Sequence, residues 1–406
     1  MPSKYNLFDV VGVELEYMIV GQKDMAVAPL ADVVLRDLKG QISSDVERGK
    51  ISWSNELVSH VIELKTTQPV EKTNNLSRLF HQSVLEIHEN LNEIGATLLP
   101  GGMHPTMDPF SETKLWPHEY NEIYTLYNRV FDCRGHGWSN VQSTHINLPF
   151  NGDEQFKLLH AAIRMILPII PGLTAASPLL AGELTGFYDT RLDFYQKNQQ
   201  KIPSIAGEIV PEPIYSHAEY DEQIFKKIRS DIKPFDTENI LKDQFLNSRG
   251  AIARFDRGAI EIRLLDIQES PRADIAAVNL IVGVIKDLVS RLNDVHFNFG
   301  ESQLKKILLQ TIETGELTEV RDKKYLMALG FPAFSRSVED IWFGLYDRIK
   351  GNYSPAQRQD MELLLSVGTL AGRMIKGFNA DQSPNKSLNL MKKLNQALLA
   401  NEFYLP

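Results

Sequence analysis

Cysteine is almost absent from this chain. Cys133 is the only one among 406 residues, so no disulfide can form within the chain. Long apolar runs are absent too: the most apolar stretch, residues 163–180, contains an arginine and three prolines, which excludes a transmembrane helix there. The first residues lack the apolar core of a signal peptide. We therefore expect a cytoplasmic protein with no membrane partner.

Positive charge is also in short supply. The chain has 43 Lys and Arg residues against 52 Asp and Glu, which gives a net charge of −9 and a pI near 5.7. This balance disfavours nucleic acid as a partner. Neither a Walker-type phosphate loop nor a Gly-x-Gly-x-x-Gly motif occurs, so a Walker-type ATPase and a nicotinamide enzyme are disfavoured as well.

Acidic and apolar residues alternate in the segment Gly-Val-Glu-Leu-Glu-Tyr at residues 12–17. On a β-strand, side chains two residues apart share a face, so Glu14 and Glu16 would lie on one face and Val13 and Leu15 on the other. Two like charges at that spacing repel each other and need a cation between them. Taken alone, the segment also fits a solvent-facing acidic edge.

A second β-prone segment, residues 61–66, carries Glu63 in its middle, and Glu56 lies seven residues before Glu63. Because this separation is odd, an unbroken strand would place the two glutamates on opposite faces. We therefore expect either a bulge between them or Glu56 on the loop before the strand.

Two later segments, residues 141–149 and 257–265, also combine an apolar face with a sparse polar face. The polar face would carry Ser143, His145 and Asn147 in the first segment, and Glu261 and Arg263 in the second. Four such strands are best explained as one sheet that presents a single polar, concave surface.

The ligands on this predicted surface are rich in oxygen, which suits Mg²⁺ or Mn²⁺ better than zinc. Arg254, Arg257 and Arg263 fall within ten residues of one another and could donate forked hydrogen bonds to phosphates. A surface ion-pair network is the alternative for this trio. Divalent cations beside arginines are typical of phosphate chemistry.

The order of these motifs resembles the glutamate–cysteine ligases, which belong to the glutamine-synthetase-like superfamily of carboxylate–amine ligases. Residues 260–267, Ile-Glu-Ile-Arg-Leu-Leu-Asp-Ile, are similar to the family's Glu-x-Arg-x-Leu-Asp strand. Four further segments resemble the bacterial type 2 branch: residues 102–105, 176–178, 185–191 and 270–274. The resemblance covers residues 10 to 295.

The resemblance implies an α+β fold, namely a curved, mainly antiparallel β-sheet with helices packed on its outer face. It also implies ATP-dependent amide formation: a carboxylate attacks the terminal phosphate of ATP, and an amine then displaces phosphate from the acyl phosphate. The small-molecule substrates would be ATP, glutamate, and cysteine or another amine. With cysteine as the amine, the pathway would be glutathione biosynthesis.

The resemblance also assigns roles by position. The ligands of Mg²⁺ (or Mn²⁺) would be Glu14, Glu16, Glu56, Glu63, His145 and Glu261. The ATP-binding residues would be His145, Asn147, Arg254 and Arg257. The catalytic residues would be Glu63, Glu261 and Arg263, and the substrate contacts Tyr188, Arg191 and Arg263, with Tyr195 as a further candidate.

One departure leaves the second substrate open. The type 2 branch often has His-x-His where this chain has His145, Ile146 and Asn147. Two alternatives to glutamate–cysteine ligation therefore remain: a ligase for a different amine or a phosphotransferase of the same superfamily, and a non-catalytic nucleotide-binding homologue.

Residues 76–94 have the periodicity of an amphipathic helix. Residues 117–132, with Pro117 near the start, and the strongly apolar residues 273–292 are also predicted to be helical. Residues 172–218 lack periodicity and contain several Pro and Gly residues, which favours a long functional loop that shapes the substrate pocket. We expect a catalytic domain at residues 1–300.

Residues 301–406 are predicted to form helices only, packed on the outer face of the sheet of the same domain or serving as a homodimer surface. Ser354-Pro355 and Ser383-Pro384 are the predicted starts of two of these helices, since serine caps a helix and proline suits its first position.

Overall fold

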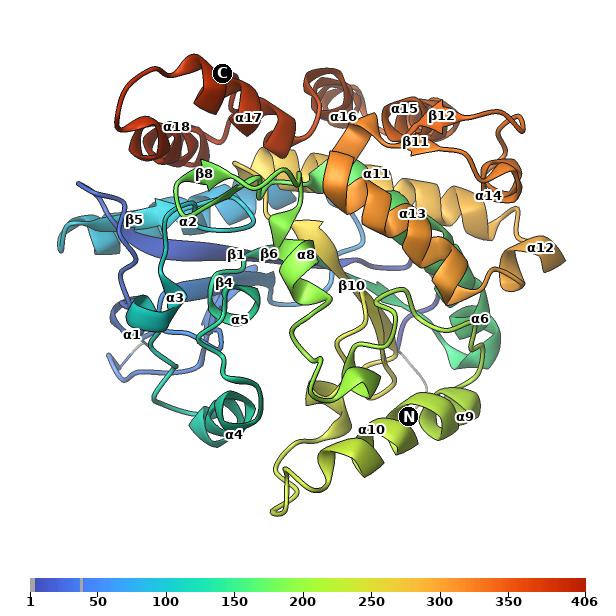
Figure 1. Cartoon of the computed structure of the whole chain (residues 1–406), viewed down its shortest axis with the longest axis horizontal. Coiled ribbons are helices and arrows are strands. Elements are labelled where there is room, and N and C mark those ends of the chain that lie inside the picture. The colour runs from blue at the N-terminus through green and yellow to red at the C-terminus, as the bar shows by residue number, and fades with distance from the viewer. Residues whose placement is uncertain (1–3, 37–38) are drawn as a thin grey trace.

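The computed structural model describes residues 4–36 and 39–406 and is built around an antiparallel β-sheet (Figure 1). The strands lie in the order β2 (Asp45–Arg48), β3 (Ile51–Asn55), β4 (Val61–Thr66), β1 (Gly12–Gly21), β6 (Ser143–Pro149), β10 (Ala259–Asp266) and β9 (Ala251–Arg254). An eighth strand, β5 (Ala96–Leu99), pairs with the second half of β1. This sheet confirms the α+β fold class.

One face of the sheet is apolar and forms the main core. Alternation along β1 places Val13, Leu15, Tyr17 and Ile19 on this face, and all four are fully buried. The helices α2 (Leu76–Asn92), α6 (Gly152–Ile166) and α11 (Pro271–Val289) contribute to the same core cluster. Alternating residues thus determine which face of each strand meets the helices.

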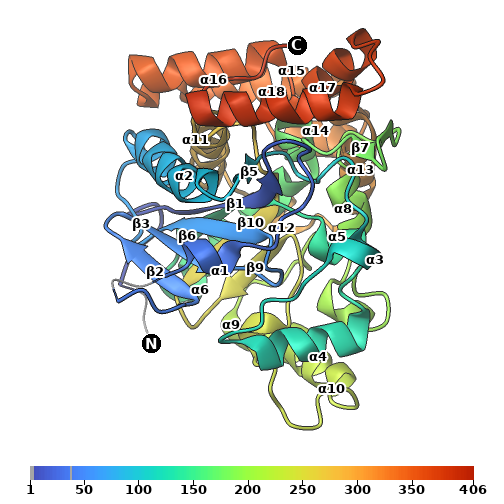
Figure 2. The same ribbon diagram turned by 90° about the vertical axis from the view of Figure 1, so that its left-hand side faces the viewer.

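The opposite face of the sheet is polar and is partly covered by other segments. Figure 2 shows α4 (Asn121–Phe131) and α10 (Lys226–Ile232) on the side of the sheet away from α2 and α11. The segment 172–218 is not a structureless loop, because it contains the short elements β7 (Leu179–Leu180), β8 (Glu183–Leu184) and α8 (Thr190–Tyr195). Helix α9 (His217–Tyr220) begins at its end.

The chain after residue 300 packs mainly on helices. It contains α13 (Glu301–Thr314), α14 (Lys323–Ala328), α15 (Val338–Ile349), α16 (Pro355–Val367), α17 (Leu370–Ala380) and α18 (Lys386–Ala400). Helices α15 and α16 contact α11, and α18 contacts α2 and β5. Among the strands of the sheet, β5 has the most extensive contact with these helices.

A second core cluster joins the C-terminal helices to this end of the sheet. Met18 and Val20 in β1 point to the polar side of the sheet, beyond the glutamates, and pack with Met374 of α17 and Leu394 of α18. The C-terminal helices therefore wrap around the end of the sheet rather than lying over one face. Figures 1 and 2 show this C-terminal layer on top of α2 and α11.

Several predicted element boundaries need correction. The helix predicted for residues 117–132 begins only at Asn121, and the predicted all-helical tail also holds a two-stranded ladder of β11 (Glu319–Val320) and β12 (Arg336–Ser337). Ser354 does cap α16, whereas α18 begins after Asn385, and Ser383 does not cap it.

The remaining short helices complete the fold. They are α1 (Ala31–Val34), α3 (Pro109–Glu112), α5 (His136–Ser139), α7 (Pro171–Thr174) and α12 (Asp294–Phe297). Within the described ranges, every helix is too short or too polar to cross a lipid bilayer.

Candidate active site

Strand register brings the predicted polar residues together on one face of the sheet. Glu16 on β1 lies directly opposite Glu63 on β4, and Glu14 lies opposite His145 on β6. On the far side of β6, Asn147 lies opposite Glu261 on β10. Three neighbouring strand pairs therefore align these side chains into one patch, as the alternation of the sequence predicted.

Glu56 reaches the same patch from a loop. It lies just after the end of β3 and before β4, so the loop alternative is correct and no bulge is needed. Ligand oxygens of Glu16, Glu56 and Glu63 lie within 4.8 Å of one another. A second group, made of Glu14, Glu63 and His145, meets the same limit. The two groups overlap at Glu63, which could serve two cations.

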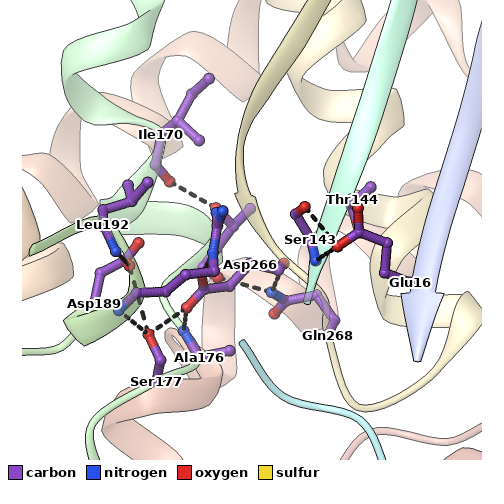
Figure 3. Close-up of polar contacts among 12 residues, drawn as sticks. Glu16, Ser143, Thr144, Ile170, Ala176, Ser177, Asp189, Leu192, Asp266 and Gln268 are labelled. Carbon is purple, nitrogen blue, oxygen red and sulfur yellow. Dashed lines mark hydrogen bonds and ion pairs between the residues drawn. The ribbon is translucent and has the colours of Figure 1, made fainter. Parts of the chain in front are cut away.

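Hydrogen bonds from residues of β6 hold the carboxylates of Glu14 and Glu16 on β1 in place. His145 Nδ1 lies 3.0 Å from Glu14 Oε2, and Asn147 Nδ2 donates to Glu14 Oε1 at 3.0 Å. The backbone N–H and the hydroxyl of Ser143 both donate to Glu16 Oε2, at 2.6 and 2.8 Å (Figure 3). The carboxylates are therefore oriented before any cation binds.

Protonation reflects the crowding of negative charge. Burial and the neighbouring Glu14 raise the pKa of Glu63 to about 7, and burial together with Glu16 and Glu63 raises the pKa of Glu56 well above its usual range. Burial also acts to raise the pKa of Glu14, but the hydrogen bond and charge of His145 lower it to about 2. Carboxylates are therefore in excess at this patch, and a divalent cation would offset their repulsion.

Glu261 stands slightly apart from the two ligand groups. Its carboxylate lies 3.9 Å from His145 Nδ1, 3.1 Å from Arg263 Nε and 3.5 Å from a terminal nitrogen of Arg254. Arg257 is farther out: its side chain is 63% exposed. Two of the three arginines therefore converge on the patch, while the third lies at its rim.

Two cavities adjoin this patch. The outer cavity, of about 730 Å³, is lined by Glu14, Glu63 and Glu261 and by all three arginines. The inner cavity, of about 240 Å³, is lined by Glu16, Arg191 and Tyr195. Glu56, His145 and Arg263 line both cavities. A molecule in one cavity would therefore lie next to a molecule in the other, with the carboxylate patch beside both.

Arg191 and Tyr188, both predicted substrate contacts, lie in different places. Arg191 is 2% exposed and lines the inner cavity. Tyr188 lines neither cavity and instead packs its ring against the backbone of Gly315 and near Gly372 in the C-terminal region. The structure therefore gives Tyr188 a packing position rather than one in the candidate site.

Sequence reasoning missed several residues of the inner cavity. Tyr124 and Tyr127 of α4 and Trp138 of α5 form part of its wall. Lys65 on β4 was also missed, although its Nζ lies 3.4 Å from Glu63 Oε1 and the residue alternates with Glu63. Only Lys65 could have been found from the sequence. Aromatic residues on a helix have the same pattern whether they pack in a core or line a cavity.

Comparisons with known proteins bear on this site. The model of the family "Glutamate-cysteine ligase family 2 (GCS2)" matches residues 10–311. An uncharacterized protein of Archaeoglobus fulgidus is 31% identical over 327 residues, which cover 78% of this chain and 87% of that protein. A protein of Nitrosospira multiformis named "Putative glutamate–cysteine ligase 2" is 29% identical over 191 residues, 45% of this chain and 46% of that protein.

Solved structures share the fold at low sequence identity. The glutamate–cysteine ligase of Francisella tularensis, in complex with AMP, has a TM-score of 0.61 at 13% identity and covers 97% of this chain and 89% of its own. A bifunctional glutathione synthetase of Pasteurella multocida has a TM-score of 0.58 at 14% identity, over 97% of this chain and 53% of its own. These likenesses concern the fold, whereas the match over residues 10–311 is specific to one family. This chain belongs to glutamate–cysteine ligase family 2.

Proposed function

We propose that this protein is an ATP-dependent carboxylate–amine ligase that joins the side-chain carboxylate of glutamate to an amine, with cysteine as the first candidate. One observation carries the proposal: two groups of ligand atoms that share Glu63 lie between a cavity lined by three arginines and a smaller cavity lined by Arg191. Membership of the family supports a ligase, and this geometry supplies separate places for a nucleotide and a small acid.

The residues fit divalent cations. The predicted ligands, Glu14, Glu16, Glu56, Glu63, His145 and Glu261, are mostly carboxylates, which Mg²⁺ and Mn²⁺ prefer. Glu16 and Glu63 face each other in register while largely buried, an arrangement that is costly without a cation. When bound, the cations would neutralise the phosphates of ATP and so weaken their repulsion of the attacking carboxylate.

The arginines have separate roles in this proposal. Arg254 and Arg257 line only the outer cavity of the two and would bind the phosphates of ATP, with His145 and Asn147 at the boundary of the patch. Arg263 lines both cavities, so its guanidinium can bind the transferring phosphate or the acid that receives it. Fixing both reactants in this way can supply roughly 7–11 kcal/mol of the barrier.

The proposed reaction has two steps. An oxygen of the glutamate side-chain carboxylate forms a bond to the terminal phosphorus of ATP, the bond from that phosphorus to ADP breaks, and an acyl phosphate results. The nitrogen of the amine then attacks the acyl carbon, the bond from carbon to the phosphate oxygen breaks, and the amine loses a proton. The products are an amide, ADP and phosphate.

The experiment that tests this proposal is phosphate release from ATP and Mg²⁺ with glutamate and a panel of amines led by cysteine. We expect release to require glutamate and one amine, with a γ-glutamyl amide detected by mass. Transfer of phosphate to the amine, with no amide, would instead identify a phosphotransferase. Nucleotide binding without turnover on any pair would identify a non-catalytic homologue.

A further inference from the structure

A buried carboxylate that the proposed reaction does not use lies beside the inner cavity. Asp266 is the last residue of β10 and is fully buried. Four segments that were singled out in the sequence meet at it: residues 102–105, 176–178, 185–191 and 260–267. Their meeting point is not one of the ligand groups around Glu63. Asp266 therefore has a role other than holding cations, although Glu261 in the same strand is a predicted ligand.

Asp266 accepts hydrogen bonds from one of these segments through one oxygen and from a second segment through the other oxygen. Its Oδ2 accepts from the backbone N–H of Ala176 at 2.7 Å and from the hydroxyl of Ser177 at 2.8 Å (Figure 3). Its Oδ1 accepts from Nε of Arg191. Ser177 Oγ in turn accepts from the backbone N–H of Arg191 at 3.1 Å. The guanidinium of Arg191 is therefore bonded to Asp266 directly. The backbone N–H of Arg191 is linked to Asp266 through the Ser177 hydroxyl.

Gly102 makes room for this carboxylate. A Cβ atom at that position would lie 2.3 Å from Cγ of Asp266, far inside van der Waals contact. The backbone N–H of Gly102 donates to the carbonyl of Ala176 at 3.0 Å, so the same glycine also holds the segment that hydrogen-bonds Asp266. A residue without a side chain is thus needed where Asp266 approaches the backbone.

Part of the Arg191 guanidinium has no hydrogen-bond partner in the described structure. It lines the inner cavity and is 2% exposed, and its Nη2 is buried without a hydrogen-bond partner among the described residues. A buried guanidinium donor left unpaired is costly, so a ligand that supplies an acceptor there would be held strongly. A carboxylate oxygen suits this position, because it accepts a strong, charge-assisted hydrogen bond from a guanidinium nitrogen.

A second buried aspartate, Asp189, lies close to Arg191 and has a different hydrogen-bond partner. Asp189 accepts from the backbone N–H of Leu192 at 2.8 Å and so caps α8, the helix that carries Arg191. Burial and the charge of Asp266 raise the pKa of Asp189 well above its usual range. In the described structure the guanidinium of Arg191 donates to Asp266 and not to Asp189.

We propose that Asp266 is a positioning residue that holds Arg191 so that its free Nη2 binds a carboxylate of the substrate in the inner cavity. This inference rests on the proposed function and extends it. Arg191 does not line the outer cavity. The carboxylate that it binds is therefore a different one from the carboxylate that receives the phosphate, and the substrate must carry a second acidic group, as glutamate does.

The test compares Michaelis constants in two backgrounds. Asp266→Asn keeps the shape of the side chain but removes its charge. In the otherwise unchanged protein we expect it to raise KM for glutamate about tenfold or more and to leave KM for ATP within about twofold. In an Arg191→Met background we expect Asp266→Asn to have no further effect on KM for glutamate, because the group it positions is gone.

Two further variants separate positioning from folding. Asp274→Asn changes another buried aspartate of the same region, which accepts from Thr144 Oγ1 and Gln268 N and has no arginine partner in the described structure, so it should leave KM for glutamate unchanged. Ser177→Ala removes one hydrogen bond to Asp266 and the acceptor of the Arg191 backbone N–H, leaves the bond from Arg191 Nε to Asp266 in place, and should raise KM for glutamate a few-fold. This milder variant keeps the test decisive if Asp266→Asn does not fold.

Three results would overturn the inference. Equal effects of Asp266→Asn with and without Arg191, or equal rises in KM for glutamate and for ATP, would show that Asp266 is structural only. If Asp266→Asn fails to fold, an unchanged KM for glutamate in Ser177→Ala would do the same. The wild-type protein alone tests the proposed function, and if it does not turn over glutamate, both proposals fail. If the wild type turns over glutamate and the variants keep its KM, only the positioning role of Asp266 is rejected.

Discussion

Glu63 is the residue on which the candidate site most depends. It belongs to both groups of ligand atoms and faces Glu16 across the strand pair. Its Oε1 accepts a hydrogen bond from Ser54 at 2.6 Å and lies 3.4 Å from Nζ of Lys65. A residue shared by two cation sites has a larger effect than one that serves a single site, because its loss weakens both.

We expect Glu63→Gln and Glu261→Gln each to lower kcat by about 100-fold or more while the protein keeps its thermal midpoint, since a neutral amide replaces an anionic ligand. The measurement is phosphate release at saturating substrates, with circular dichroism to confirm folding. Glu47→Gln is the matched control, because Glu47 is an exposed carboxylate on β2, at the edge of the same sheet, and lines neither cavity. Normal activity in both site variants would contradict the cation assignment.

Asp274 gives a pH dependence of stability. Burial raises its pKa in the folded protein from 3.8 to about 8. The folded state therefore binds more protons than the unfolded state between these values, and stability falls as the pH rises from about 4 to about 8. The slope from this group is at most about 1.4 kcal/mol per pH unit.

The variant Asp274→Asn does not titrate, so its stability relative to the wild type should increase across the same pH range. Urea unfolding of both proteins at pH 5, 6, 7 and 8, chosen within that window, measures the difference. A constant difference in unfolding free energy would show that Asp274 has the same pKa folded and unfolded.

At the residue scale, the sequence predicted the patch well where strands are regular. The two-residue period of a strand is fixed, so Glu14, Glu16, His145 and Glu261 could be assigned to one face without a structure. Tyr188 could not be placed, because its segment has no period. The family resemblance suggested it as a substrate contact together with Arg191, but helix α8, which carries Arg191, begins only at Thr190.

At the scale of elements, the sequence predicts which segments form strands better than it predicts strand order or the first residue of a helix. The sequence predicted β1, β4, β6 and β10 as strands, because each carries an unbroken apolar face. It did not predict their order in the sheet, which depends on contacts between distant segments. Helix α4 begins later than its apolar period suggested, after Tyr120 in the left-handed region at φ 72°.

The two Ser-Pro pairs offer a direct test of capping. Ser354 accepts from the backbone N–H of Gln357 and completes a capping box at α16, whereas the hydroxyl of Ser383 accepts only from Asn389 in the described contacts. We expect Ser354→Ala to lower the free energy of unfolding by about 1 kcal/mol and Ser383→Ala by less than half of that. Urea denaturation of the two variants compares them, and equal losses would contradict the cap at α16.

At the scale of the whole molecule, the C-terminal region is part of the same core. Arg373 in α17 pairs with the fully buried Glu269, which follows β10, and Nη1 of Arg373 donates to the carbonyl of Tyr404 at 2.6 Å. The backbone N–H of Tyr404 donates to Glu269 at 3.1 Å. The end of the chain is thus tied to the segment that leads from the site into α11. Composition and periodicity predicted these helices but not this contact, because it joins residues far apart in the sequence.

We therefore expect the chain to unfold in one cooperative transition and the fragment 1–300 not to fold by itself. Removing residues 301–406 would expose the faces of α11 and β5 that now pack on α15, α16 and α18. Calorimetry of the whole chain, and circular dichroism of the fragment, measure the two outcomes. Two separate transitions, or a fragment that melts cooperatively, would identify independent domains.

The most direct test of the proposed reaction follows one oxygen atom of the glutamate side chain. Glutamate labelled with ¹⁸O in its side-chain carboxylate is incubated with ATP, Mg²⁺, the protein and the amine that supports turnover. If the carboxylate attacks the terminal phosphate, one labelled oxygen leaves with it, and the released phosphate gains a single ¹⁸O as the amide forms. Amide formation with unlabelled phosphate would contradict activation of the carboxylate by ATP.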